Sequence, residues 1–138
     1  MGAQQGGFTL IELIVVIVIL GVLAATALPK FAGLGADARL AKMNAARAAI
    51  VSASNMYHGR WLANGSPSAG ATYDTDVTVN GNGYPDFAGM AKAVNTGDYA
   101  GSFATDGILI PDGGHTSCSL TYVPSSGTVT FAATSANC

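Results

Sequence analysis

The sequence lacks the motifs that most enzymes use for catalysis. Its 138 residues contain no G-x-S-x-G, H-E-x-x-H or P-loop pattern, and Gly33-Leu34-Gly35 is too short for a dinucleotide loop. The two histidines, His58 and His115, have no neighbouring ligand residues in the sequence, so we interpret both as surface residues. The sequence therefore predicts a protein that is not an enzyme and that binds no cofactor.

Cysteine is equally scarce, which excludes the common metal and haem patterns. The two cysteines, Cys118 and Cys138, form neither a C-x-x-C nor a C-x-x-C-H motif, and both lie in the polar half of the chain. If that half is exported, a disulfide between them is the expected state. On the chain-entropy model such a bridge, which closes a loop of about 20 residues, is worth roughly 3 kcal/mol.

Charged residues make up only 10% of the chain, and they are unevenly distributed. Residues 30–60 carry a net charge of +4, from Lys30, Arg39, Lys42, Arg47 and Arg60 against Asp37. Residues 61–138 carry −5, from Asp74, Asp76, Asp86, Asp98, Asp106 and Asp112 against Lys92. The basic stretch of one copy could thus meet the acidic stretch of another, although two solvated surfaces explain the pattern equally well. Nucleic-acid binding by the acidic part alone is disfavoured.

One long apolar run, Phe8–Leu28, contains a single carboxylate, Glu12, and no base. A helix of this length reaches roughly 30 Å, enough to cross a bilayer, and it exceeds the usual length of a signal-peptide core. A carboxylate deep in a membrane costs about 2.5–3.5 kcal/mol, so a passive anchor would be expected to lack it. We therefore expect a compensating partner for Glu12; the alternative is that it lies shallow and reaches the interface.

The residues around that carboxylate carry a family resemblance. The stretch Gly7-Phe8-Thr9-Leu10-Ile11-Glu12, followed by apolar residues, resembles the start of a type IV prepilin. The resemblance implies a leader at residues 1–7, a prepilin peptidase that cuts between Gly7 and Phe8, and N-methylation of Phe8. It also implies that Glu12 pairs with the Phe8 amine of a neighbouring subunit during assembly. Physically, Phe8 and Glu12 are four residues apart on one helical face, so a pair within one chain is possible as well.

The leader departs from that family in one respect. Residues 1–7 contain no Lys or Arg, whereas basic residues usually keep a terminus cytoplasmic. Either the true start lies upstream of Met1, or recognition depends on the Gly7–Phe8 site itself.

The helix continues beyond the apolar run. We expect an apolar transmembrane or assembly segment over residues 8–29 and an amphipathic stem over 30–62, with helix-weakening residues at Gly21 and Pro29. In the pilin family the interval 22–28 melts when subunits pack; for an isolated subunit a mild kink is the expected state. The spacing of the stem predicts a buried stripe: Leu40, Met43, Ala46, Ile50, Ala53, Tyr57 and Trp61.

Residues 63–138 are expected to form a small β head. We expect a loop over residues 63–72, a strand over Asp74–Val79, a short helix within Pro85–Asn95 and a strand around Ile108-Leu109-Ile110. Oxygen-bearing residues between Asp74 and Asp86 suggest calcium, but the EF-hand spacing is absent and turn chemistry explains them more simply.

The best-defined element of the head is a C-terminal hairpin, in which 117–123 and 128–133 flank Pro124-Ser125-Ser126-Gly127. Pairing Val123 with Thr128 places Tyr122 opposite Val129, Leu120 opposite Phe131 and Cys118 opposite Ala133, with the apolar residues on one face. A sheet closed by a late disulfide resembles type IVa pilins. Two further stretches, Leu28-Pro29-Lys30-Phe31 with Asp37-Ala38-Arg39 and Cys118-Ser119-Leu120-Thr121-Tyr122, are most similar to the mannose-sensitive haemagglutinin pilin group.

The sequence thus predicts an α+β chain with a type IV pilin fold, in which a long N-terminal helix packs on a small antiparallel sheet. The resemblance implies a structural subunit of an extracellular filament used for adhesion or motility. Its expected partners are further copies of itself, the peptidase, the inner-membrane assembly machinery and a possible surface ligand, and its precursor would cross the inner membrane once. A secretion pseudopilin and a membrane-anchored binding domain that does not polymerise are the alternatives.

Overall fold

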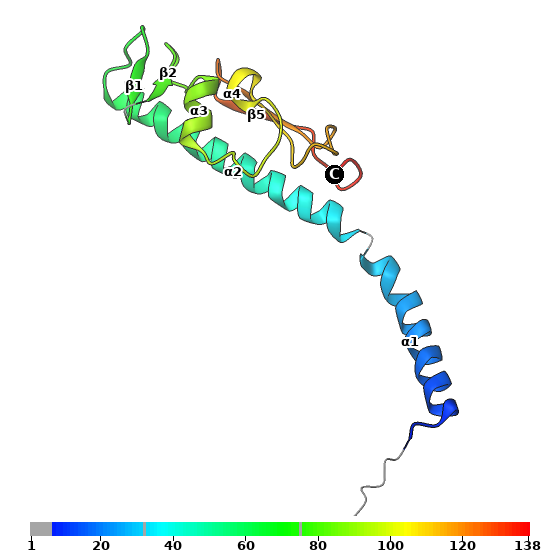
Figure 1. Ribbon diagram of the computed structural model, residues 1–138. Coiled ribbons are helices and arrows are strands. Elements are labelled where there is room, and N and C mark those ends of the chain that lie inside the picture. Colours follow the sequence, from blue (N-terminus) through cyan, green and yellow to red (C-terminus); the bar gives the residue numbers. More distant parts are fainter. Residues whose placement is uncertain (1–6, 32, 75) are drawn as a thin grey trace, which may run out of the picture. The chain divides into compact units, whose positions relative to one another are not determined.

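The computed structural model describes residues 7–31, 33–74 and 76–138. Residues 1–6 of the expected leader lie outside the described residues. The chain divides into two compact units, Met1–Gly35 and Ala36–Cys138, and each is considered by itself below (Figure 1).

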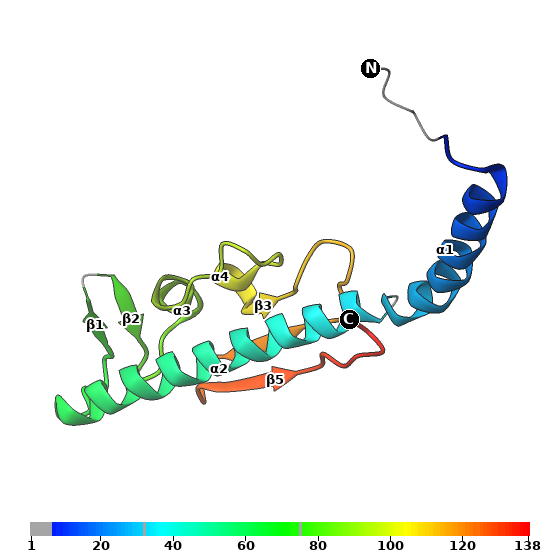
Figure 2. The same ribbon diagram turned by 90° about the horizontal axis from the view of Figure 1, so that it is seen from below.

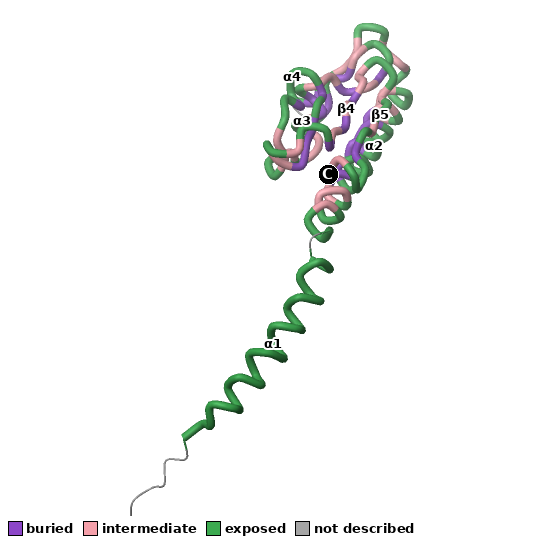
Figure 3. Tube along the Cα trace, turned by 90° about the vertical axis from the view of Figure 1, so that its right-hand side faces the viewer, coloured by how far each residue is buried: buried purple, intermediate pink, exposed green. Residues whose placement is uncertain are grey.

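Most of the described part of the first unit is helix α1, Leu10–Phe31. Phe8 and Thr9 precede the helix, so its first turn begins two residues later than the expected apolar segment. Gly21 and Pro29 both lie inside α1, and the helix is continuous through them. None of its residues is buried. In Figure 3 the whole of α1 is accordingly coloured as exposed.

Helix α2, Leu34–Ala63, supports the second unit with one buried face. Its buried residues are Met43, Ala46, Ile50, Ala53, Ser54 and Tyr57. They recur at intervals of three and four residues, which places them on one side of a helix with 3.6 residues per turn. The expected stripe is confirmed at Met43, Ile50 and Tyr57, whereas its two ends, Leu40 and Trp61, are only half-buried.

Two short strands form a hairpin near the end of α2. β1, Ala71–Tyr73, pairs antiparallel with β2, Val77–Val79. The strand expected over Asp74–Val79 is confirmed only at Val77–Val79, and the loop expected through residue 72 is wrong at its end, where β1 begins at Ala71. The physical reason is Asp74, whose φ of 49° lies in the left-handed region and turns the chain between the two strands.

A three-stranded antiparallel sheet has the order β3-β4-β5, with β3 at Ile108–Leu109, β4 at Leu120–Val123 and β5 at Thr128–Phe131. The predicted register is confirmed, since Tyr122 lies opposite Val129 and Leu120 opposite Phe131. The strands end before the expected Cys118–Ala133 pair, and the last contact is the 2.9 Å hydrogen bond from the Ala132 amide to the Ser119 carbonyl.

Two short helices complete the second unit. α3, Phe87–Ala93, begins at Asp86, whose side chain caps the helix by accepting a 2.6 Å hydrogen bond from the Gly89 amide. α4, Phe103–Asp106, was not expected from the sequence and ends at Gly107, where φ is +74°. A Cβ there would lie 2.6 Å from the Tyr122 carbonyl oxygen, so this position requires glycine.

The core lies between α2 and these elements. Met43 and Ile50 of α2 pack in one cluster with Met90, Leu120 and Tyr122, and Figure 3 shows buried segments between α2 and β4. A second cluster joins Tyr57 to the first hairpin through Tyr73, Val77 and Val79. The architecture is therefore α+β, a long N-terminal helical region with an apolar start and small antiparallel sheets packed on α2, as the sequence predicts.

Candidate functional site

The surface of α1 is the most unusual feature of the chain. Large apolar side chains are exposed along its whole length, for example Leu10 at 75% and Leu23 at 58%. By length and composition, the described residues include one helical stretch that could cross a membrane, and it begins at Leu10. Exposed apolar area of this extent is stable only when lipid or other protein covers it. We therefore infer that lipid or protein covers α1. Its first turn contains Glu12, the only carboxylate of the helix.

That carboxylate belongs to a capping box at the start of α1. Oε2 of Glu12 accepts hydrogen bonds of 2.9 Å from the Thr9 amide and 2.7 Å from the Thr9 hydroxyl. The Thr9 hydroxyl also accepts a long, 3.4 Å hydrogen bond from the Glu12 amide. This is the reciprocal Thr-x-x-Glu arrangement that satisfies amides at a helix start. The Thr9-x-x-Glu12 spacing in the sequence is a signal for this capping box, and the interpretation of Glu12 as a membrane carboxylate does not include it.

Phe8 lies immediately before this box. Its side chain is 93% exposed, and Gly7 is exposed too, so the expected cleavage position is open to a protease. Phe8, Ile11, Glu12, Val15 and Val16 line an open apolar groove of about 390 Å³. In the intact chain the Glu12 carboxylate contacts Thr9 and the Phe8 nitrogen is a peptide amide, so a pair between Glu12 and a free Phe8 amine stays a prediction.

The interval 22–28 precedes Pro29 and contains one hydrogen bond from a side chain to the backbone. Pro29 lacks an amide hydrogen and therefore leaves one carbonyl in the preceding turn without its helical donor. The Thr26 hydroxyl donates a 2.9 Å hydrogen bond to the Leu23 carbonyl in the same stretch. Such back-bonding is typical of bent or weakened helices. The unwinding expected for Gly21 and Pro29 on packing stays a prediction.

The second expected site, the disulfide, is confirmed. Cys118 and Cys138 are bonded, with their Cα atoms 4.8 Å apart and a sequence separation of 20. Both are buried, at 0% and 5% exposure. The returning tail is held by the Asn137 side chain, which accepts from the Thr134 amide at 2.7 Å and donates to the Ala132 carbonyl at 2.7 Å. Nε of Arg39 donates to the Cys138 carbonyl, which ties this loop to α2.

The side chains of Asp74, Asp76, Asn80 and Asp86 have partners within the chain. Asp74 forms a 2.5 Å ion pair with Arg60 and accepts a 3.0 Å hydrogen bond from the Tyr57 phenol. The Arg60 guanidinium, and after it the Tyr57 hydroxyl, lower the pKa of the Asp74 carboxyl. Asp86 caps α3, and Asn80 Oδ1 accepts from the amides of Asn82 and Tyr84. Turn and cap chemistry therefore accounts for these residues, and no metal-ligand cluster occurs among the described residues.

The two histidines differ from each other. Both are half-buried, so the expected surface position is met only in part. His115 lies with its Nδ1 2.6 Å from Oδ1 of Asp112. The His58 ring stacks on Tyr84 at 4.3 Å between centroids and on Trp61 at 5.5 Å. The sequence alone could not show this stack, since Tyr84 is far from His58 along the chain.

The N-terminal residues are similar in sequence to those of known proteins. Residues 2–28 match the prokaryotic N-terminal methylation motif. The chain is 39% identical over 80 residues to the fimbrial protein of Neisseria meningitidis serogroup A, a match covering 56% of the chain and 46% of that protein. It is 35% identical over 80 residues to the type IV major pilin protein PilE1 of Neisseria gonorrhoeae, covering 56% of the chain and 48% of the relative.

A third relative matches a shorter stretch. The type IV narrow pilus major component PilA5 of Thermus thermophilus is 53% identical over 47 residues, which are 34% of the chain and 40% of that protein. The chain thus spans about half the length of the curated relatives it matches. No solved structure gave a significant match.

Proposed function

We propose that the chain is the structural subunit of a type IV pilus filament and has no enzymatic role. The observation that carries this proposal is the exposed apolar surface of α1, beside a second unit that has its own hydrophobic core. The methylation motif over residues 2–28 and the similarity to named pilins support it. A helix apolar on every side can be covered first by lipid and then by the same helices of other copies.

Assembly would follow removal of residues 1–7. A prepilin peptidase cuts between Gly7 and Phe8, and the new Phe8 amine is methylated. This amine is a cation next to Thr9, which already holds Glu12 through two hydrogen bonds. The Glu12 carboxylate still has acceptor capacity on its second oxygen, so it can pair with the amine of a neighbouring copy. Such a pair fixes the axial register of one subunit on the next.

The location changes with assembly. The precursor spans the inner membrane once through α1, and the assembled chain is extracellular, where the Cys118–Cys138 disulfide is stable. Its partners are further copies of itself, the peptidase and the inner-membrane assembly machinery. The finished filament binds a surface ligand. The filament serves adhesion or motility. Within type IVa pilins we place the chain in the mannose-sensitive haemagglutinin group, on Leu28-Pro29-Lys30-Phe31 and Cys118-Ser119-Leu120-Thr121-Tyr122.

Mass analysis of material sheared from cell surfaces tests this function directly. We expect filaments whose subunit starts at Phe8, carries one methyl group on its amine and retains the disulfide. Filaments that contain residues 1–7 would contradict the processing step. A chain that stays in the membrane fraction and never enters sheared fibres would instead support the anchored binding domain.

A further inference from the structure

Most charged side chains of the second unit have partners within the same chain. Among the bases, Arg60 and Lys92 form ion pairs, with Asp74 at 2.5 Å and Asp76 at 3.3 Å. Arg39 and Lys42 donate to backbone carbonyls, those of Cys138, Asp98 and Pro111. Three further carboxylates have local partners: Asp86 caps α3, Asp106 accepts from Ser102 and Ile108, and Asp112 contacts His115.

Two opposite charges are left over. Between Ala36 and Cys138, in the part of the chain that the structure describes, the Arg47 guanidinium and the carboxylates of Asp37 and Asp98 form no hydrogen bond or ion pair. Asp37 lies in the first turn of α2, where the helix dipole stabilises a negative charge. Arg47 and Asp98 therefore remain as one unmatched cation and one unmatched anion, and both are exposed.

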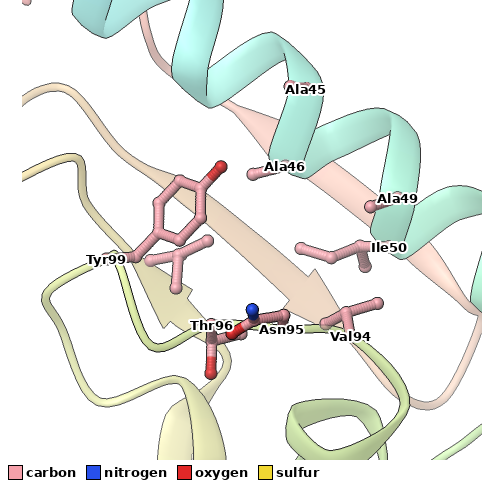
Figure 4. A pocket seen from close by; sticks show the side chains of 9 residues that line it. Ala45, Ala46, Ala49, Ile50, Val94, Asn95, Thr96 and Tyr99 are labelled. Atoms are coloured by element: carbon pink, nitrogen blue, oxygen red, sulfur yellow. The ribbon is translucent and has the colours of Figure 1, made fainter.

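These two residues lie on opposite flanks of α2. The turn that carries Asp98 is held beside Lys42, whose carbonyl accepts a 3.1 Å hydrogen bond from the Tyr99 phenol. Figure 4 shows the cavity of about 240 Å³ between this segment and α2. Arg47 instead lies over the Phe131 ring of β5, 5.3 Å from its centroid.

Helix geometry gives the same separation. Lys42 and Arg47 are five residues apart, which is a rotation of about 140° around an α-helix. In Figure 2, α3 and α4 are drawn on one side of α2 and β5 on the other. Asp98 is therefore on the far side of α2 from Arg47, and within one chain the two cannot pair.

Both patches are shaped for contact. Arg47 lines an open groove of about 280 Å³ on α2 with Asn44, Ala48 and Val51; we name it the Arg47 groove. Ala48 leaves room beside the Arg47 guanidinium, and the Asn44 amide is a second donor for a carboxylate. The opposing segment, Asn95-Thr96-Gly97-Asp98, is named the Asp98 turn.

The Asp98 turn is already ordered in the free chain. It is braced by a 3.1 Å hydrogen bond from the Gly97 amide to the Asn95 side chain. The Tyr99 amide donates a second 3.1 Å hydrogen bond to the Thr96 carbonyl. A turn held in this way loses little conformational entropy when it binds.

We propose that the Asp98 turn of one copy docks in the Arg47 groove of the next copy. The contact joins two different patches on opposite flanks, so it is heterologous: in a pair, one copy keeps a free Arg47 groove and the other keeps a free Asp98 turn. Contacts of this type build open helical arrays when the rotation between copies does not close into a ring. The inference rests on the proposed filament function. It identifies the surfaces of the second unit that meet in the filament, and burial of α1 alone does not specify these surfaces.

Charge reversal in the full-length chain tests the contact. We expect Arg47→Glu and Asp98→Lys each to lower the yield of sheared filaments by about three- to tenfold, because each places like charges together. The double variant restores the opposite charges and should recover the yield. The matched control combines Arg47→Glu with Asp37→Lys; it has the same net charge as the double variant and breaks no ion pair of the described residues, but it should not recover filaments. Membrane insertion and the disulfide are checked in every variant.

A second measurement does not depend on yield. In filaments of the Arg47→Lys chain, a zero-length carbodiimide should couple the new amine to Asp98. Mixing isotopically labelled and unlabelled subunits shows whether the two residues come from different copies. Absence of this cross-link, or wild-type filament yield from both single reversals, overturns the contact and leaves the proposed function intact. Absence of any fibre from the wild-type chain overturns both.

Discussion

The Tyr122 phenol donates a 2.9 Å hydrogen bond to the Pro85 carbonyl, and the bond is buried. It joins the centre of β4 to the segment that precedes α3. Tyr122 is 1% exposed and sits in the main hydrophobic cluster, so neither water nor another side chain can easily replace this donor.

Removing this hydroxyl should destabilise the second unit. Tyr122→Phe leaves the Pro85 carbonyl without its donor, and we expect a loss of about 1–3 kcal/mol in the free energy of unfolding. Chemical denaturation of the full chain in detergent measures it. Tyr84→Phe is the matched control, since in the described part of the chain the Tyr84 hydroxyl makes no hydrogen bond. Equal losses in both variants would contradict the role of the Pro85 contact.

Alkaline pH should lower the free energy of unfolding through the same residue, Tyr122. Burial raises the pKa of Tyr122 to about 12, above the value of about 10 of an exposed tyrosine. The native state therefore holds this proton more tightly than the unfolded state. The corresponding stability is fully present below pH 10 and is lost as the pH rises from about 10 to 12. In denaturation curves across this range, Tyr122→Phe should have a shallower pH dependence than wild type; an unchanged slope would contradict the assignment.

The disulfide should contribute measurable stability. Replacing both Cys118 and Cys138 by alanine opens a loop with a sequence separation of 20 and should cost about 3 kcal/mol. Thermal unfolding of the full chain, with reduced wild type as the comparison, measures the effect. A double variant as stable as oxidised wild type would show that the packing of the C-terminal loop is sufficient without the bond.

The turn between β4 and β5 should tolerate no side chain at Gly127. Its φ is +67°, and a Cβ there would lie 2.2 Å from the Tyr84 ring, so Gly127→Ala forces both backbone strain and a clash. We expect a loss of about 1–3 kcal/mol in unfolding free energy. Gly113→Ala is the control, because a Cβ there meets nothing within 4 Å. Equal melting temperatures for the two variants would contradict this account.

The assembly role proposed for Glu12 predicts different effects on membrane insertion and on polymerisation. Glu12→Ala keeps α1 apolar, so membrane insertion should be unchanged or better, whereas sheared filaments should disappear. Thr9→Val removes the hydroxyl that holds the Glu12 carboxylate but leaves the charge, and it should only reduce filament yield. Membrane fractionation and electron microscopy measure the two effects. A wild-type yield of fibres from the Glu12→Ala variant would contradict an assembly role for this carboxylate.

Periodic features could be predicted from the sequence. The buried face of α2 follows from apolar residues at helical spacing, and the hairpin register follows from matching Tyr122 and Leu120 with Val129 and Phe131. The Thr9–Glu12 capping box was equally readable. The turn at Asp74 could not be predicted in the same way, because its side chain contacts Arg60 and Tyr57 of α2, which are distant in the sequence.

Non-local contacts account for the other differences. The His58–Tyr84 stack joins residues that are close only after folding. Helix α4 has four residues, too few for a periodic signal. The unmatched state of Arg47 could be recognised only once the partners of the other bases were known.

Both hydrophobic clusters of the second unit use only residues from Leu40 onward. The core of the second unit therefore needs no residue of α1. In the proposed filament, passage of a subunit from bilayer to fibre would exchange one apolar environment for another around α1 without opening either cluster.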